Sequence, residues 1–171
     1  MEFEEFATAR TPALLRYAYM LCGDRELARD LTQEVLIPTL VKWRRVSRVE
    51  RPDAYVRAML TNEYLTMRRR KSPTTVTVSY EGIEELCAQA SSAEAAYTER
   101  AAMMQRLSTL PARQRAVIVL RYYEDLSDAQ IAHVLGCRAS TVRAYATRAL
   151  ATLRVDMAPR PALVAQNGGG A

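Results

Sequence analysis

The residues whose side chains are best suited to binding a ligand lie on the second helix of a helical hairpin predicted over residues 126–150. Ser127 and Gln130 have capping-box spacing, so a first helix should begin at Asp128, and Gly136 supplies the turn that ends it. The exposed face of the second helix carries Arg143, Ala144, Thr147 and Arg148. Guanidinium groups bind guanine edges or phosphates, and two short helices about a glycine turn fit the DNA major groove. The segment therefore predicts a helix-turn-helix that reads duplex DNA.

Basic residues are concentrated in two separate segments of a chain whose net charge is +5. Residues 42–71 contain ten basic and three acidic side chains, and residues 138–171 contain five basic and one acidic. The first 41 residues are net acidic. This uneven distribution indicates two sites for a polyanion rather than one diffuse coating.

Cysteine and histidine give no sign of a metal or catalytic site. Cys22, Cys87 and Cys137 are far apart, odd in number and without Cys-x-x-Cys spacing, which favours reduced, buried thiols in a cytoplasmic protein. A structural or surface role is favoured over catalysis for His133, the single histidine. The N-terminus lacks the apolar core of a signal peptide, and no apolar run approaches the length of a membrane span. We therefore expect no enzyme, no cofactor and no metal.

The chain divides into two helical halves, and the β-branched runs that a sheet would need are scarce. The predicted fold class is therefore all-α, with two small helical domains joined by a flexible linker. We place the domains at 3–71 and 93–156, with Pro111 opening the helix that precedes the hairpin. The linker is expected at 72–92 and a disordered tail at 157–171.

Glycine and proline positions set the expected helix ends in the first half. Gly23 should end one helix and Asp24 should cap the next, and Pro52 should lie at the start of the last. Helical periodicity is interrupted near Pro12, and Pro38 predicts a kink or an early end because it lacks a backbone donor. The buried stripe of the second helix is expected to contain Leu27, Leu31, Val35, Leu36 and Leu40.

Both halves resemble a known family. In the first half the matching runs are DRELARDLTQEVL, then Trp43, then RPDAYVRAMLTNEYLTMRRRK; in the second they are LPARQRAVIVLRYYEDLSDAQIAHVLGC, TVR and RAL. In this order and at this spacing they resemble a sigma factor of the extracytoplasmic-function (ECF) group of the sigma-70 family. The runs ALLRYAYMLCGD and AYVRAMLTNE most resemble an actinobacterial branch of that group. The resemblance covers roughly residues 3–71 and 94–154.

The resemblance implies a surface for RNA polymerase. In the family, the helix that carries Asp-Leu-x-Gln-Glu binds the clamp helices of the polymerase β′ subunit. The matching residues here are Asp30, Leu31, Gln33 and Glu34. The spacing of Asp30, Gln33 and Glu34 places three polar side chains on one helix face, as on any solvated helix. Pro38 departs from the family pattern near the end of this helix.

The resemblance also implies that the first basic segment opens the −10 promoter element. Asn62 matches the polar residue at the pocket for an unpaired base, and an amide can donate to and accept from a base edge. The expected −10 contacts are Arg44, Arg45, Arg48, Asn62, Arg68, Arg69 and Lys71. Trp43 could stack on a base, although packing in the core is favoured for it.

The helix-turn-helix of the second half is implied to read the −35 element as duplex. The expected contacts are Arg138, Ser140, Thr141, Arg143, Ala144, Thr147 and Arg148. Arg143 lies near the start of the recognition helix, where side chains reach deepest into the groove, and is expected to read a base. Arg138, Ser140 and Ala144 depart from the usual Ser, Gly and Ser of the family, which affects the cap and register of this helix.

The sequence is interpreted as a promoter-specificity subunit with no chemistry of its own. The expected partners are core RNA polymerase, promoter DNA and an anti-sigma protein that masks these surfaces, with no membrane. The alternative is a stand-alone helix-turn-helix repressor or activator that binds duplex DNA as a dimer; the second basic, Asn-bearing helix argues against it. A third hypothesis, a helical adaptor without DNA contact, leaves both basic segments unexplained.

Overall fold

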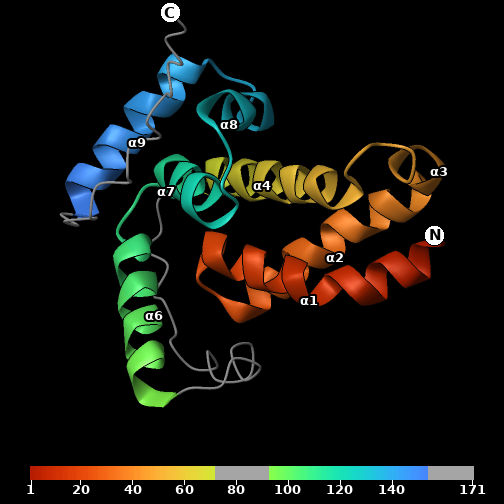
Figure 1. Cartoon of the computed structure of the whole chain (residues 1–171), viewed down its shortest axis with the longest axis horizontal. Helices are drawn as coiled ribbons and strands as arrows, with labels where there is room; N and C mark the ends of the chain where they lie inside the picture. Colours follow the sequence, from red (N-terminus) through yellow and green to blue (C-terminus); the bar gives the residue numbers. More distant parts are fainter. Residues whose placement is uncertain (72–92, 154–171) are drawn as a thin grey trace, which may run out of the picture.

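The computed structural model of the chain describes residues 1–71 and 93–153, and these ranges are built from helices (Figure 1). The first range holds α1 (Phe3–Cys22), α2 (Arg25–Val41), α3 (Trp43–Val46) and α4 (Pro52–Arg70). The second holds α6 (Ala93–Ser108), α7 (Ala112–Ile118), the π-helix η1 (Val119–Tyr123), α8 (Asp128–Leu135) and α9 (Ala139–Leu153). The all-α fold class is confirmed. The expected linker and tail lie outside the described residues.

The turn between α1 and α2 follows from two adjacent residues. Gly23 adopts a left-handed conformation with φ 71°, and its N–H donates to the carbonyl of Tyr19. Asp24 then caps α2, because its side chain accepts a hydrogen bond of 2.8 Å from the N–H of Leu27. Pro52 occupies the first turn of α4, where its missing donor is not needed. The helix ends expected at Gly23, Asp24 and Pro52 are therefore confirmed.

The interruption expected near Pro12 and the early end expected at Pro38 are wrong, while the alternative of a kink at Pro38 stays a prediction. Helix α1 continues through Pro12, and α2 continues past Pro38 to Val41. Pro12 is exposed on α1, and so is Thr8, whose carbonyl loses its i+4 donor because proline has no N–H. After Pro38, the buried Thr39 anchors the last turn, and the N–H of Lys42 donates to the carbonyl of Pro38 at 3.1 Å. Tertiary packing thus outweighs the local cost of proline at both positions.

The two described ranges pack against each other. In Figure 1, α7 and α8 lie against α4, and α7 also contacts α1. Buried residues of both ranges form one hydrophobic cluster, to which Leu60 of α4 and Val117 of α7 belong. The ring of Tyr17 in α1 stacks on that of Tyr123 in η1, with 6.4 Å between the centroids. We call this packing of α7, η1 and α8 against α1 and α4 the docked arrangement.

The π-helix η1 continues α7 and was not expected from the sequence. The N–H of Glu124 donates to the carbonyl of Val119 at 3.1 Å, which is the i to i−5 spacing of a π turn. Asp125 then adopts a positive φ of 53°, and the chain turns into α8. The widened turn contains Arg121, whose side chain reaches the first residue of α8, Asp128.

Candidate nucleic-acid interface

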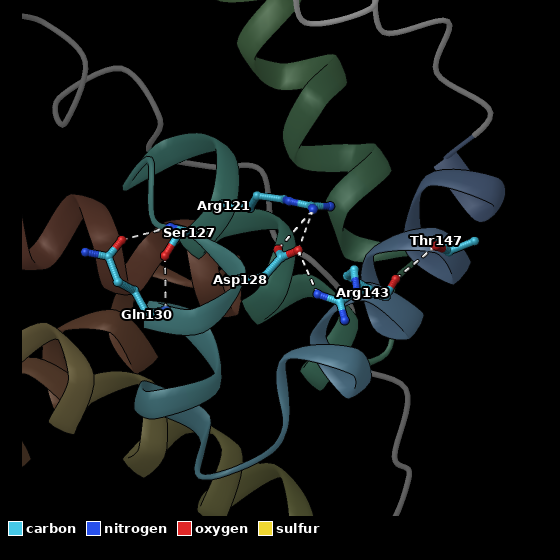
Figure 2. Close-up of polar contacts among 6 residues, drawn as sticks. All are labelled: Arg121, Ser127, Asp128, Gln130, Arg143 and Thr147. Atoms are coloured by element: carbon cyan, nitrogen blue, oxygen red, sulfur yellow. Dashed lines mark hydrogen bonds and ion pairs between the residues drawn. The ribbon is translucent and has the colours of Figure 1, made fainter. Parts of the chain in front are cut away.

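The hairpin predicted from the sequence is formed by α8 and α9. The Ser127 hydroxyl accepts from the N–H of Gln130 at 3.2 Å, and the Gln130 side chain accepts from the N–H of Ser127 at 2.8 Å (Figure 2). Gly136 ends α8 in the left-handed conformation, with φ 64°. The capping box, the start of α8 at Asp128 and the glycine turn are therefore confirmed.

Helix α9 separates an apolar face from a basic face. Its buried residues are Val142, Ala146, Ala149 and Leu153. Its exposed polar or small residues include Ser140, Arg143, Ala144, Thr147 and Arg148, while Thr141 is half-buried. Arg138 precedes the helix, and its carbonyl accepts from the N–H groups of Thr141 and Val142 at 3.0 and 3.1 Å. The residues expected at the −35 element therefore lie together on one accessible side of the hairpin.

One of these arginines lies next to a carboxylate that the sequence did not single out. Nη1 of Arg143 lies 4.0 Å from Oδ2 of Asp128. Nη2 of Arg121 lies 2.9 Å from Oδ1 of the same Asp128 and donates to Oδ2 at 3.1 Å. Figure 2 shows the carboxylate between the two guanidinium groups. Spacing alone would not have revealed this cluster, since Arg121 reaches it through the π turn.

The residues expected at the −10 element do not form one patch. Arg44, Arg45 and Arg48 are exposed on and beside α3, where they line a surface depression with Val49. The exposed Arg69 and Lys71 and the half-buried Arg68 lie at the opposite end of α4 (Figure 1). At 1.5 Å per residue, the length of α4 separates the two groups by about 25 Å. A single strand that contacted both groups would follow the whole helix.

The aromatic residue near the −10 contacts, Trp43, is partly buried and packs against the core. The ring centroids of Trp43 and Phe6 are 4.9 Å apart, and those of Trp43 and Phe3 are 5.6 Å apart. The indole N–H of Trp43 donates to the carbonyl of Met1 at 3.2 Å. The favoured packing of Trp43 in the core is therefore confirmed.

Asn62 is exposed on α4, but its side-chain amide already has a partner. Nδ2 of Asn62 donates to the main-chain carbonyl of Val134 in α8 at 3.0 Å. The contact joins residues that are far apart in sequence and belongs to the docked arrangement. In this arrangement, the amide expected at the pocket for a base is turned toward the helix-turn-helix.

Charged side chains cross the same interface. Arg115 of α7 is 4 % exposed, and its Nε donates to the carbonyl of Met20 in the last turn of α1 at 2.8 Å. Desolvation by burial lowers the pKa of Arg115. Nε of Arg57 in α4 lies 3.1 Å from Oε2 of Glu124, and burial raises the pKa of Glu124 although Arg57 acts in the opposite direction. The interface therefore contains charges whose burial opposes docking.

Three of the four residues expected to bind polymerase are exposed on α2, and the fourth is buried. Asp30, Gln33 and Glu34 are exposed on α2. Leu31 does not belong to this surface, because it is 3 % exposed and packs in the core. Leu40 was expected in the buried stripe, yet 51 % of it is exposed.

Apolar residues extend this face toward the end of α2. Ile37 is 64 % exposed and Val41 is 80 % exposed, and with Leu40 they continue one turn beyond Glu34. Ile37 and Val41 were not expected in this surface, although the i, i+4 spacing of Gln33, Ile37 and Val41 places them on one helix face.

The described residues contain no group of histidine, cysteine and carboxylate side chains that could hold a metal ion. Cys22 is buried and Cys137 is half-buried, and both are free thiols; Cys87 lies outside the described residues. Burial raises the pKa of the Cys22 thiol to about 11. None of the helices in the described ranges is both long and apolar enough to cross a membrane.

Comparisons with known proteins match both parts of the chain. The family model for sigma-70 region 2 matches residues 6–74, and that for sigma-70 region 4 matches residues 100–153. The RNA polymerase sigma-E factor of Streptomyces avermitilis is 33 % identical over 163 residues, which cover 94 % of this chain and 87 % of that protein. The ECF RNA polymerase sigma factor SigE of Mycolicibacterium smegmatis is 28 % identical, covering 96 % and 65 %.

A solved structure has the same fold. It is the sigma factor RpoE of Bartonella quintana in complex with the anti-sigma factor NepR, with a TM-score of 0.65 and 24 % sequence identity, covering 89 % of this chain and 94 % of that one. The two region models occur in the same order as α1–α4 and α6–α9. The chain therefore belongs to the sigma-70 family of RNA polymerase sigma factors, in its ECF group.

Proposed function

We propose that this sigma factor binds core polymerase through the exposed face of α2, opens the −10 element with region 2 and reads the −35 element with α9. Region 2 is assigned to residues 3–71 and region 4 to residues 93–156. The observation that carries the proposal is the accessible basic face of α9, which follows the capped helix α8, in a chain that matches both regions. As a sigma factor, the chain is not an enzyme: it supplies promoter specificity to the polymerase.

The polymerase surface is proposed to comprise Asp30, Gln33 and Glu34 together with exposed Ile37 and Val41. The polar residues supply charge and hydrogen-bond acceptors, and the apolar pair is typical of the core of a protein interface. Such an apolar group surrounded by polar side chains on one helix fits a helical partner such as the β′ clamp helices.

The test of this surface is binding of the full chain to core polymerase. Replacing Gln33 and Glu34 together by Ala should weaken binding measurably, because Ala keeps the helix while removing the polar contacts. The matched control replaces Gln105 and Glu99 by Ala, which removes an exposed amide and an exposed carboxylate from α6. Equal affinity of both variants and the original chain would show that this face of α2 is only solvated surface.

The −35 surface is proposed to contain Arg138, Ser140, Thr141, Arg143, Ala144, Thr147 and Arg148. Arg143 is assigned to base readout, and Arg148 to readout or the backbone. Sequencing of DNA bound by the holoenzyme would give the promoter, and titrations against single −35 substitutions would follow. Arg143→Ala should lower the preference for the matched sequence, whereas neutralising Arg68 and Arg69 should weaken all sequences alike and flatten the salt dependence.

The −10 surface is proposed to contain Arg44, Arg45, Arg48, Asn62, Arg68, Arg69 and Lys71. Nδ2 of Asn62 donates one of its two hydrogens to Val134, and α8 lies against α4 beside it, so a base can use the whole amide edge only after region 4 leaves α4. The connection over residues 72–92 could span about 70 Å if extended, so chain length does not oppose that separation.

The stand-alone repressor is not favoured, because such a protein has no need of region 2. Gel filtration distinguishes the two hypotheses: a one-to-one complex with core polymerase supports the sigma factor, and a stable homodimer on a palindrome supports the repressor. An anti-sigma protein is proposed as a further partner, since the sigma factor of similar fold is bound to one.

A further inference from the structure

The carboxylate of Asp128 lies between two arginines with different surroundings. Arg121 and Asp128 are both largely buried, with 24 % and 20 % of their side chains exposed, and their closest N···O distance is 2.9 Å. Arg143 on α9 is 60 % exposed and lies 4.0 Å from the other carboxylate oxygen. One partner therefore fixes Asp128, while the other remains accessible to a ligand (Figure 2).

The backbone fixes this carboxylate from two sides. Asp128 is the first residue of α8, directly after the capping residue Ser127, so the capping box determines its position. Arg121 reaches it from the π helix, which is anchored by the buried Val119 and Leu120. A charge that is held in this way can orient a longer, mobile side chain beside it.

An unpaired Arg143 would have a choice of DNA ligands. The guanidinium group can bind a guanine edge, which specifies sequence, or a phosphate oxygen, which does not. Asp128 attracts the guanidinium toward α8 and repels phosphate from the same space. A distance of 4.0 Å is longer than a hydrogen bond, so the guanidinium keeps its own donors for a base.

We infer that Asp128, fixed by Arg121, is a positioning residue for −35 recognition that acts through Arg143. This inference rests on the proposed base readout by Arg143. Asp128 itself makes no base contact. It restricts the Arg143 guanidinium to orientations that suit a base edge and lowers the affinity of this site for phosphate.

The test compares holoenzyme affinities for the recovered promoter and for its single −35 substitutions, at several salt concentrations. We call the ratio of holoenzyme affinities for the matched and the substituted −35 sequences the discrimination. Asp128→Asn should lower it by at least about threefold, out of the roughly 5- to 150-fold that a bidentate arginine–guanine pair supplies. The same variant should bind the mismatched sequences more tightly, with a steeper salt dependence, because Arg143 becomes free to bind phosphate. A merely structural role would lower the amount of folded protein without changing this ratio.

The matched control is Glu99→Gln, which removes one negative charge from the exposed surface of α6 without contact to Arg143. It should leave discrimination unchanged. If Asp128→Asn fails to fold, Arg121→Ala tests the same inference, because it releases the carboxylate and should also lower discrimination.

Each variant is then combined with Arg143→Ala. In that background, Asp128→Asn and Arg121→Ala should have no further effect on discrimination, because the side chain through which they act is gone. Discrimination that is unchanged in both single variants, or lowered equally with and without Arg143, overturns the inference while base readout by Arg143 still stands. If Arg143→Ala itself leaves discrimination unchanged, the proposed readout is wrong and the inference is wrong with it.

Discussion

The hydrogen bond between Asn62 and Val134 predicts that Asn62→Ala has different effects in the free protein and in the holoenzyme. Loss of a hydrogen bond to an unpaired base should cost about 1–3 kcal/mol, or roughly 5- to 150-fold in affinity for a single-stranded −10 oligonucleotide. This loss applies to the holoenzyme, in which region 4 must have left α4 before the whole amide edge of Asn62 can face the base.

In the free protein, the same substitution also removes the bond of 3.0 Å that favours the docked arrangement. That bond is exposed, and the released carbonyl of Val134 can bind water, so its net contribution is about 0.5–1 kcal/mol. Undocking then becomes about two- to fivefold easier, which partly offsets the lost base contact. The loss of oligonucleotide affinity should therefore be about two- to fivefold smaller in the free protein than in the holoenzyme.

Fluorescence anisotropy with a labelled −10 oligonucleotide measures both affinities. Gln105→Ala, which removes an exposed amide from α6, should change neither. Equal losses in the free protein and the holoenzyme would refute docking as the state of the free chain. No loss in either would place the base-holding residue elsewhere.

Three further predictions concern stability and reactivity. The Tyr17 hydroxyl donates to the Thr61 hydroxyl at 2.6 Å, because the Thr61 hydroxyl itself donates to a backbone carbonyl. Tyr17→Phe should therefore lower the free energy of unfolding, measured in urea, by about 1–3 kcal/mol, and adding Thr61→Val should restore part of the loss. With a pKa of about 11 against an ordinary 9.0, Cys22 should have about 100-fold less thiolate at pH 8 than an ordinary thiol. Iodoacetamide should therefore label Cys137 well before Cys22, as measured by mass spectrometry of the peptides, and equal rates would contradict the burial of Cys22. Gly136→Ala meets no atom within 4 Å, so its cost is that of a left-handed backbone alone, about 1–2 kcal/mol in thermal unfolding, and an unchanged melting temperature would contradict this conformation.

Local signals in the sequence predicted the helix-turn-helix well. The capping box of Ser127 and Gln130, the left-handed Gly136 and the apolar stripe of α9 each depend on residues within one or two turns. Propensity failed at Pro12 and Pro38, because the sequence does not show which side of a helix faces water or which neighbours are buried. The π turn was missed because residues 116–120 form a continuous apolar run that is buried throughout, in which the extra residue of a π turn shifts no visible periodicity.

The contacts that define the docked arrangement could not be predicted from periodicity. Asn62 and Val134 are separated by 72 residues, and Arg115 and Met20 by 95. In both contacts the acceptor is a backbone carbonyl, and no sequence pattern indicates which carbonyl will accept a hydrogen bond. The sequence therefore indicated which residue types could bind DNA or polymerase, whereas the hydrogen-bond partners of these residues could be identified only from the three-dimensional structure.

The chemical nature of that acceptor limits how mutation can alter the docked arrangement. Every residue type carries a main-chain carbonyl, so codon changes at Val134 replace a side chain and leave the acceptor of Asn62 in place. Selection for variants with an undocked region 4 and an intact base-holding amide therefore has to work on side-chain contacts, which are polar at Arg57, Glu124 and Arg115 and apolar at residues such as Val117 and Tyr123. A mutational spectrum collected under such selection would be spread over the side chains of the interface, and a substitution at Val134 would act through its packing and not through the hydrogen bond.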